Sequence, residues 1–164
     1  MTFPYTICFC RCKDSILMLY RRRPLNSERW NGLGGKIASG ETPLECVRRE
    51  VLEEAGIDLR RFGTLRFAGV VTWKKGVDPT RPSTGMYAFV AELPDDWFVW
   101  EGTEEAEEGL LAWKPLGWVC NPQNEAVVSK VSRFLPGLLN SRELMEYHCE
   151  YEGDELVDLV VLTL

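Results

Sequence analysis

The 164-residue sequence has only one histidine, no apolar run approaching the length of a membrane helix, and no excess of basic residues. Because a membrane helix needs roughly 20 predominantly apolar residues, neither a membrane span nor a membrane partner is predicted. Asp and Glu number 25 against 19 Lys and Arg, and this acidic balance argues against binding duplex nucleic acid through its phosphates. An acidic enzyme can still handle phosphates if its carboxylates hold metal ions that face them.

The histidine and cysteine residues also give little indication of a catalytic site. The lone His148 lies in a polar and aromatic C-terminal stretch, which disfavours hydrolysis by a Ser-His-Asp or Cys-His arrangement. The six cysteines lack CxxC spacing, and Cys8, Cys10 and Cys12 alternate along a predicted strand, which places them on one face. Reduced structural thiols in a cytoplasmic protein are therefore expected, and the N-terminus shows no export signal.

The apolar content of 45% is enough for a core, and no repeat or linker interrupts the chain, so residues 1–164 are predicted to form a single domain. Alternating and continuous apolar runs predict strands at 5–12, 15–20, 64–73, 85–92, 109–113, 145–151 and 156–163. Lys13 and Asp14 form the expected turn of the first hairpin. Helices are predicted at 43–55 and 124–135, and this order indicates an α+β fold with a mixed sheet.

The helix predicted at 43–55 has clear start and stop signals. Thr42 can cap its N-terminus, Pro43 suits its first position, and Gly56 is the usual left-handed terminator. Its apolar residues recur at helical spacing and are expected to face the core as one stripe, made of Leu44, Val47 and Val51 with Ala55 alongside.

Three glutamates on this helix are the most informative polar residues. Glu50, Glu53 and Glu54 stand at i, i+3 and i+4, so their carboxylates are expected on one face, away from the apolar stripe. Such a stripe is either a solvated acidic face or a cation site, because like charges repel unless a cation lies among them. Carboxylate oxygens are the ligands that Mg²⁺ and Mn²⁺ prefer.

The wider spacing identifies a family resemblance. Gly35, five residues, Glu41, seven residues, Arg49-Glu50-Val51, one residue, Glu53-Glu54, one residue and Gly56-Ile57 match each fixed position of the Nudix box. The chain therefore resembles the Nudix hydrolases, whose fold is a mixed sheet between helices, an α/β/α sandwich. The box covers about a seventh of the chain. From Tyr5 to about Gly63 the sequence is similar to the MutT-type enzymes that act on oxidised purine nucleotides, most closely at 29–36 (RWNGLGGK).

The resemblance implies a metal site that uses Mg²⁺, with Mn²⁺ as the alternative. Glu53 and Glu54 would be the principal ligands, Glu50 a ligand or a general base, and the Gly34 carbonyl a further ligand. The family often adds one acid from outside the box, and Glu108, or less favourably Glu107, matches its position ahead of an aromatic-containing strand. A solvated acidic loop is the alternative for that run of glutamates.

The remaining residues of the box have supporting roles by resemblance. Arg49, counted among the catalytic residues, is expected to orient the acids through an ion pair rather than to touch the substrate. Glu41 is expected to brace the loop. Gly35 would let that loop approach the metal or the phosphates, because glycine has no side chain in the way.

Substrate recognition is predicted at Asn31, Arg21, Arg23 and Lys36. The Asn31 amide can donate and accept hydrogen bonds to a purine, although a turn role is the alternative. Arg21 and Arg23 are at strand spacing and face either phosphates or solvent. The chain departs from the MutT-type pattern because residues 113–136 contain no Trp-Pro-Asp-Asp, only Trp118, Asn121, Asn124 and Glu125. Phe67 and Trp73 could stack on a base or pack in the core.

The predicted function is Mg²⁺-dependent hydrolysis of a nucleoside triphosphate, preferably an oxidised purine such as 8-oxo-dGTP, to a monophosphate and pyrophosphate. Within the family the alternatives are ADP-ribose or another sugar nucleotide, a dinucleoside polyphosphate, or the 5′ end of RNA. A nucleotide sensor without catalysis is the alternative from another class, and the three intact glutamates argue against it.

Overall fold

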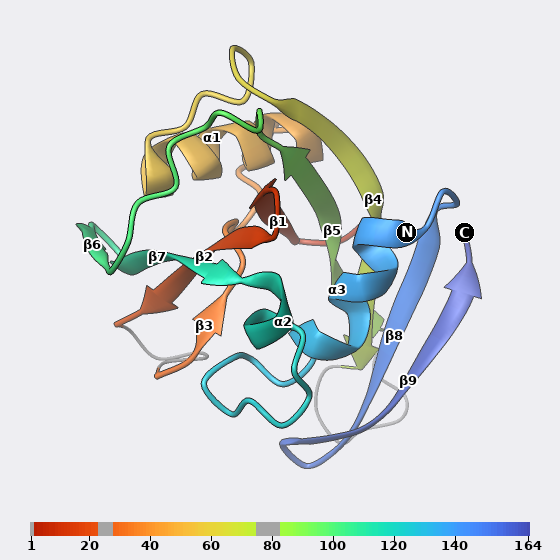
Figure 1. Ribbon diagram of the computed structural model, residues 1–164. Helices are drawn as coiled ribbons and strands as arrows, with labels where there is room; N and C mark the ends of the chain where they lie inside the picture. Colours follow the sequence, from red (N-terminus) through yellow and green to blue (C-terminus); the bar gives the residue numbers. More distant parts are fainter. Residues whose placement is uncertain (1, 23–27, 75–82) are drawn as a thin grey trace.

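A computed structural model describes residues 2–22, 28–74 and 83–164. One mixed sheet forms the centre of the molecule, with α1 on one face and α2 and α3 on the other (Figure 1). The strands are β1 (Tyr5–Cys12), β2 (Ser15–Arg21), β3 (Trp30–Asn31), β4 (Thr64–Lys74), β5 (Ser83–Glu92), β6 (Glu104–Ala106), β7 (Gly109–Pro115), β8 (Met145–Glu152) and β9 (Glu155–Thr163). The helices are α1 (Pro43–Ala55), α2 (Leu116–Val119) and α3 (Val131–Asn140). The predicted sandwich is confirmed.

The order of strands across the sheet is β6-β7-β2-β1-β5-β4-β8-β9, with β3 beside β2. All seven predicted strands are present, and β3 and β6 are the additions. Both are short, two and three residues, and so carry no detectable apolar period. Within the described residues, no helix is both long and apolar enough to cross a bilayer.

The segment after β3 is inserted between β1 and β2. The first half of β2 pairs with the end of β1, while its second half pairs with β3. The start of β1 pairs instead with the inserted segment, because Thr6 N donates to Gly35 O at 2.9 Å and Cys8 N donates to Leu33 O at 2.7 Å. This insertion brings the glycines that precede the helix into the sheet, directly below α1.

Two apolar cores lie on the two faces of the sheet. The core under α1 contains Cys8, Cys10 and Cys12 together with Val47 and Val51 of the helix. The predicted alternation of the three cysteines is confirmed, and all six cysteines are free thiols. The core on the other face contains the α3 side chains and the opposite residues of β1. The sheet is therefore covered on both sides where the glutamate helix lies.

Helix α1 has the predicted bounds and caps. The Thr42 hydroxyl accepts from Glu45 N, and Glu45 returns a bond to Thr42 N, which completes a capping box. Gly56 ends the helix in the left-handed conformation, with φ 69°. One part of the predicted apolar stripe is wrong, because Leu44 is 40% exposed. Leu44 and Glu45 of the first turn are exposed, and the buried residues of α1 are Cys46, Val47, Glu50, Val51 and Glu54.

The helix predicted at 124–135 is wrong in its bounds. Helix α3 begins at Val131 and continues through Pro136 to Asn140. Residues 126–128 are tied to β3 instead, since Trp30 N donates to Ala126 O at 2.7 Å and Val128 N donates to Trp30 O at 2.9 Å. The apolar spacing of Val127 and Val128 reflects burial in a non-helical segment, which a periodic pattern alone cannot distinguish from a helix.

Candidate functional site

The glycines below α1 are fitted closely to the glutamates. Gly34 has φ 134°, and a Cβ there would collide with the carbonyl oxygen of Thr6, so only glycine is accommodated. Gly34 N donates to Glu54 Oε1 at 2.7 Å. At Gly35 a Cβ would lie 2.6 Å from Glu50 Oε1. The two glycines therefore leave the space that the Glu50 and Glu54 carboxylates occupy.

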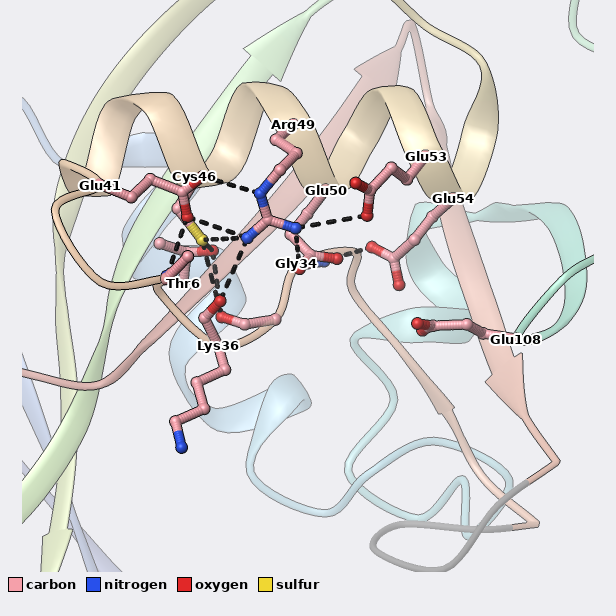
Figure 2. Close-up of polar contacts among 12 residues, drawn as sticks. Thr6, Gly34, Lys36, Glu41, Cys46, Arg49, Glu50, Glu53, Glu54 and Glu108 are labelled. Carbon is pink, nitrogen blue, oxygen red and sulfur yellow. Dashed lines mark hydrogen bonds and ion pairs between the residues drawn. The ribbon is translucent and has the colours of Figure 1, made fainter.

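The three helix glutamates have different surroundings. Glu50 and Glu54 are 9% and 5% exposed, whereas the Glu53 side chain is 57% exposed. All three carboxylates project from one side of α1, as predicted, but their expected separation from the apolar stripe is wrong, because Glu50 and Glu54 are buried together with Val47 and Val51. Figure 2 shows the three carboxylates on the same side of the helix axis as the glycine segment, with Glu108 on the far side of Glu54.

Arg49 joins the helix glutamates Glu50 and Glu53 to the loop that precedes α1. Its guanidinium makes two bonds to Glu41, Nε–Oε2 at 2.7 Å and Nη2–Oε1 at 2.9 Å, and a third to the carbonyl oxygen of Lys36 at 3.2 Å. Nη1 lies 2.8 Å from Glu50 Oε1 and 3.3 Å from Glu53 Oε2 (Figure 2). Glu41 also accepts from Ala38 N at 3.0 Å. The ion pairs expected of Arg49 and the loop contact expected of Glu41 are both present.

Arg21 contacts three other segments of the chain: α1, the glycine segment before it and the turn between β6 and β7. From the end of β2, Nη1 lies 2.6 Å from Glu108 Oε2, and Nη2 donates to Gly34 O at 2.9 Å and to Glu54 Oε2 at 3.0 Å. The turn between β6 and β7 supplies Glu108, which is thereby brought to the helix glutamates. These contacts were missed by sequence reasoning. The available signal was the alternation in β2, since Arg21 shares the face of Leu17 and Leu19, which is the face covered by α1.

Burial and arginine contacts move the carboxyl pKa values in opposite directions. Burial raises the pKa of Glu54 to about 8, against the opposing effects of the Gly34 N–H and of Arg21. Burial likewise raises the pKa of Glu50, with Arg49 acting against it. The hydrogen bonds from Arg49, followed by that from Ala38 N, lower the pKa of Glu41 to about 2. A charged Glu54 is therefore costly unless a cation compensates it, whereas a charged Glu41 is already compensated.

The donor set suits a hard divalent cation. Every candidate ligand presents oxygen, which is the donor that Mg²⁺ and Mn²⁺ prefer. Two guanidinium groups meet five carboxylates, so the arginines leave acidic charge unbalanced; the carboxylates belong to Glu41, Glu50, Glu53, Glu54 and Glu108. A cationic group already lies among three of the predicted ligands, because Arg21 contacts Gly34 O, Glu54 and Glu108. The residues therefore fit a metal ion.

The ligands are nevertheless not gathered into a ready metal cluster. Among the residues that the structure describes, no group of three or more His, Cys, Asp or Glu side chains is close enough to hold a metal ion. Glu50 is drawn toward Arg49 at one end, and Glu54 and Glu108 are drawn toward Arg21 at the other. Metal binding would thus require these side chains to rearrange.

The predicted substrate residues occupy several positions around the acids. Asn31 lies in β3 opposite Leu19, and its Oδ1 accepts from Gly32 N at 2.8 Å, as a turn residue does. The Lys36 side chain is exposed and points away from the carboxylates (Figure 2), so only its carbonyl joins the Arg49 network. Arg23 lies outside the described residues.

The aromatic and histidine side chains have packing partners. Phe67 packs against Tyr87 and Phe89, although it is 37% exposed. The Nζ of Lys130 lies 3.9 Å from the centre of the Trp73 ring. The Nδ1 of His148 is 2.8 Å from the Thr72 hydroxyl, which donates to Glu146 at 2.7 Å. These contacts do not connect His148 to the glutamates of α1.

Comparison with known proteins agrees with this geometry. A family model described as the NUDIX domain matches residues 3–134. An oxidized purine nucleoside triphosphate hydrolase from Danio rerio is 38% identical over 55 residues, 32% of this chain and 35% of that protein. An uncharacterized Nudix hydrolase, YvcI, from Bacillus subtilis is 32% identical over 117 residues, 71% of this chain and 68% of that protein.

A crystal structure of a MutT protein from Bacillus halodurans has the same fold. It superposes with a TM-score of 0.71 at 23% sequence identity and covers 96% of this chain and 95% of that one. The alignments to oxidized purine hydrolases are shorter, since the chain spans 35% of the Danio rerio protein and 42% of one from Mus musculus.

Proposed function

The chain belongs to the NUDIX family, and from this premise we propose that it is a divalent-metal-dependent pyrophosphohydrolase that cleaves a nucleoside triphosphate to a nucleoside monophosphate and pyrophosphate. The observation that carries the proposal is the convergence of Glu54, Glu108 and the Gly34 carbonyl on one cationic group. Mg²⁺ is the proposed metal, with Mn²⁺ as a substitute. A sensor that only binds nucleotides has no need of these partly buried carboxylates, whose burial is costly.

The proposed ligands are Glu53, Glu54, Glu108 and the carbonyl of Gly34, with Glu50 as a further ligand or as the base. When bound there, the cation would neutralise phosphate charge and act as a Lewis acid on the phosphate oxygens.

The protein residues supply the remaining steps. A water oxygen bonds to phosphorus while the anhydride P–O bond breaks, and a carboxylate accepts the proton of the water. Glu50 is suited to that proton transfer or to metal binding, because only its Oε1 is held by Arg49. Arg49 fixes α1 against the preceding loop through its two bonds to Glu41 and does not contact the substrate. This division of roles places the chemistry at the glutamates and the support at Arg49.

An oxidised purine such as 8-oxo-dGTP is the proposed base class. Support comes from the RWNGLGGK segment and from the 38% identity to the Danio rerio hydrolase over 55 residues. In this proposal the Asn31 amide nitrogen donates to the purine, because its oxygen already accepts from Gly32 N. Arg21, Arg23 and Lys36 would contribute positive charge to the polyphosphate.

The test is a hydrolysis assay with Mg²⁺ on a panel of substrates. The panel contains 8-oxo-dGTP, the ordinary nucleoside triphosphates, ADP-ribose, a diadenosine polyphosphate and triphosphorylated RNA. We expect 8-oxo-dGTP to have the highest kcat/KM. Glu53→Gln and Glu54→Gln should each lower kcat about a hundredfold or more, as loss of a group that stabilises transition-state charge does. Glu105→Gln is the matched control, since Glu105 is an exposed glutamate that pairs with Arg22.

Each outcome bears on a different part of the proposal. Full activity in Glu53→Gln and Glu54→Gln would refute the ligand assignment. Turnover of none of the compounds by the wild-type protein would favour the sensor. Preference for ADP-ribose, a dinucleotide or RNA would keep the metal chemistry and replace the base assignment.

A further inference from the structure

Arg21 is held by candidate metal ligands. Its guanidinium makes three described polar contacts, to Glu108 Oε2 at 2.6 Å, Gly34 O at 2.9 Å and Glu54 Oε2 at 3.0 Å. Each of these oxygens belongs to a residue that the proposed function assigns to the metal. The guanidinium therefore sits among the atoms that a divalent cation would need.

Arg49 differs from Arg21 in having partners outside this ligand set. Glu41 receives two of its bonds and the carbonyl of Lys36 a third. Arg49 would thus stay in place if Glu50 and Glu53 turned toward a metal. Arg21 has no such second anchor among its described contacts.

The Glu54 carboxylate shows why the two cations compete. Oε1 accepts from Gly34 N at 2.7 Å, and Oε2 faces Arg21, so both oxygens are engaged (Figure 2 shows the Gly34 contact). Two cations on one carboxylate oxygen repel each other, and the repulsion is strong where the site is shielded from water. The Glu54 side chain is only 2% exposed. Arg21 and a divalent ion bound to Glu54 Oε2 therefore exclude one another.

We propose, resting on the proposed function, that Arg21 is the resident counter-cation of the glutamate cluster and that the divalent metal displaces it. In the metal-free protein Arg21 bonds to both Glu54 and Glu108 and holds them together. Metal binding breaks the Arg21 contacts to Glu54, Glu108 and Gly34 O. The released guanidinium, still attached to the end of β2 beside the site, is then free for an anionic phosphate group. Metal loading thereby switches Arg21 from an internal ion pair to a substrate contact.

The first test measures metal affinity without substrate. Isothermal titration with Mn²⁺ compares the wild-type protein with Arg21→Gln and with Arg22→Gln. Arg22 is the matched control, because it is the next residue and pairs with Glu105 at 2.8 Å, away from the cluster. We expect the Kd for Mn²⁺ to fall about three- to tenfold in Arg21→Gln, which is the size expected from removing one partly exposed competing ion pair. Arg22→Gln should leave it unchanged. An unchanged or weaker Mn²⁺ affinity in Arg21→Gln overturns the proposal.

The second test observes displacement directly in the wild-type protein, so it does not depend on the folding of a variant. The arginine Nε–H resonances are followed by NMR during a Mg²⁺ titration, and the Arg21 signal is assigned from its loss in Arg21→Lys. The Arg21 resonance should move to a new position at saturation, while that of Arg66, bound to Leu138 O at 2.8 Å, stays fixed. An Arg21 resonance that is unmoved at Mg²⁺ saturation overturns displacement, even if the Kd changes through simple charge repulsion.

Neither test uses turnover, so the two proposals fail separately. Displacement of Arg21 by Mg²⁺ in a protein that hydrolyses no member of the panel would contradict the proposed function alone. Hydrolysis with Arg21 still bound to Glu54 would contradict the displacement alone.

Discussion

The two arginines of the site carry the same charge, yet their surroundings give them different roles. Arg49 is fixed by Glu41 and by the Lys36 carbonyl, and touches the candidate ligands Glu50 and Glu53 with one nitrogen. Arg21 is bound to Gly34 O, Glu54 and Glu108.

The difference indicates that a metal ion can replace an arginine in an ion pair only if the guanidinium has no other partners that keep it in place. A bidentate arginine and carboxylate pair outside the metal site is structural, because geometry as well as charge fixes it. A guanidinium bound to metal ligands is a substitute for the metal. The stability contributed by the Arg49 contacts should therefore not change when metal binds, whereas the stability contributed by the Arg21 contacts should depend on metal.

The largest expected effect on stability is at Arg49. Arg49→Met leaves Glu41 and Glu50 without their guanidinium, and loss of one partner from a largely buried ion pair costs about 3 kcal/mol. We expect about this loss in the free energy of unfolding from urea denaturation, in EDTA and in Mg²⁺ alike. Arg21→Met should cost a comparable amount in EDTA, because its partner Glu54 is only 2% exposed, and close to nothing in saturating Mg²⁺. Equal metal dependence of the two variants would contradict the distinction.

The next largest effect is expected on activity at Gly35. A Cβ in Gly35→Ala would lie 2.6 Å from Glu50 Oε1, so the carboxylate must turn away and leave its contact with Arg49. We expect kcat to fall at least about tenfold, which is about 1.4 kcal/mol in barrier height. The measurement is steady-state hydrolysis of the best substrate in the panel. Gly117→Ala is the matched control, because no atom lies within 4 Å of a Cβ at that position.

A smaller effect on stability is expected at the N-terminal cap of α1, which has no part in the contacts of either arginine. Thr42→Ala removes the hydroxyl that accepts from Glu45 N at 3.1 Å and should cost about 1 kcal/mol of stability. Because this cap is not part of the metal site, the loss should be the same in EDTA and in Mg²⁺. A loss that Mg²⁺ abolished would show that the cap and the metal site are coupled.

A pH dependence of stability is expected at Glu41. The folded-state pKa of about 2 lies below the ordinary value of 4.5, so the Arg49 pair stabilises the protein fully above about pH 5 and loses that stabilisation as the pH falls toward 2. The stability advantage of wild type over Glu41→Gln, about 1 kcal/mol at neutral pH, should therefore shrink on acidification. Denaturation curves between pH 3 and pH 7 measure it. An advantage that grew at low pH would reverse the assigned shift.

In the metal-free protein, the pH dependence of stability at Glu54 should have the opposite sign to that at Glu41. Its folded-state pKa of about 8 exceeds 4.5, so in EDTA the wild type should lose stability relative to Glu54→Gln as the pH rises from 5 to 9. The same denaturation series in EDTA checks this, and Mg²⁺ should reduce the loss by compensating the charged carboxylate.

Much of the fold was readable from local signals. The caps and bounds of α1, the hairpin at Lys13 and all seven predicted strands follow from propensity and apolar period, which neighbouring residues encode. The errors arose where a distant segment decides the conformation. Val127 and Val128 carry a helical spacing but are held by the backbone of Trp30, and Leu44 has a core-facing spacing but is exposed.

The sequence by itself determined the chemical inventory of the site, because residues at i, i+3 and i+4 of a helix are brought together by helix geometry alone. Only the tertiary structure decided which glutamates are buried and which cation meets them. Arg21 lies 33 residues from Glu54 and 87 from Glu108, and no local rule relates positions so far apart. Their meeting depends on the insertion of the glycine segment between β1 and β2 and on the pairing of β2 with β7, which are outcomes of packing the whole sheet.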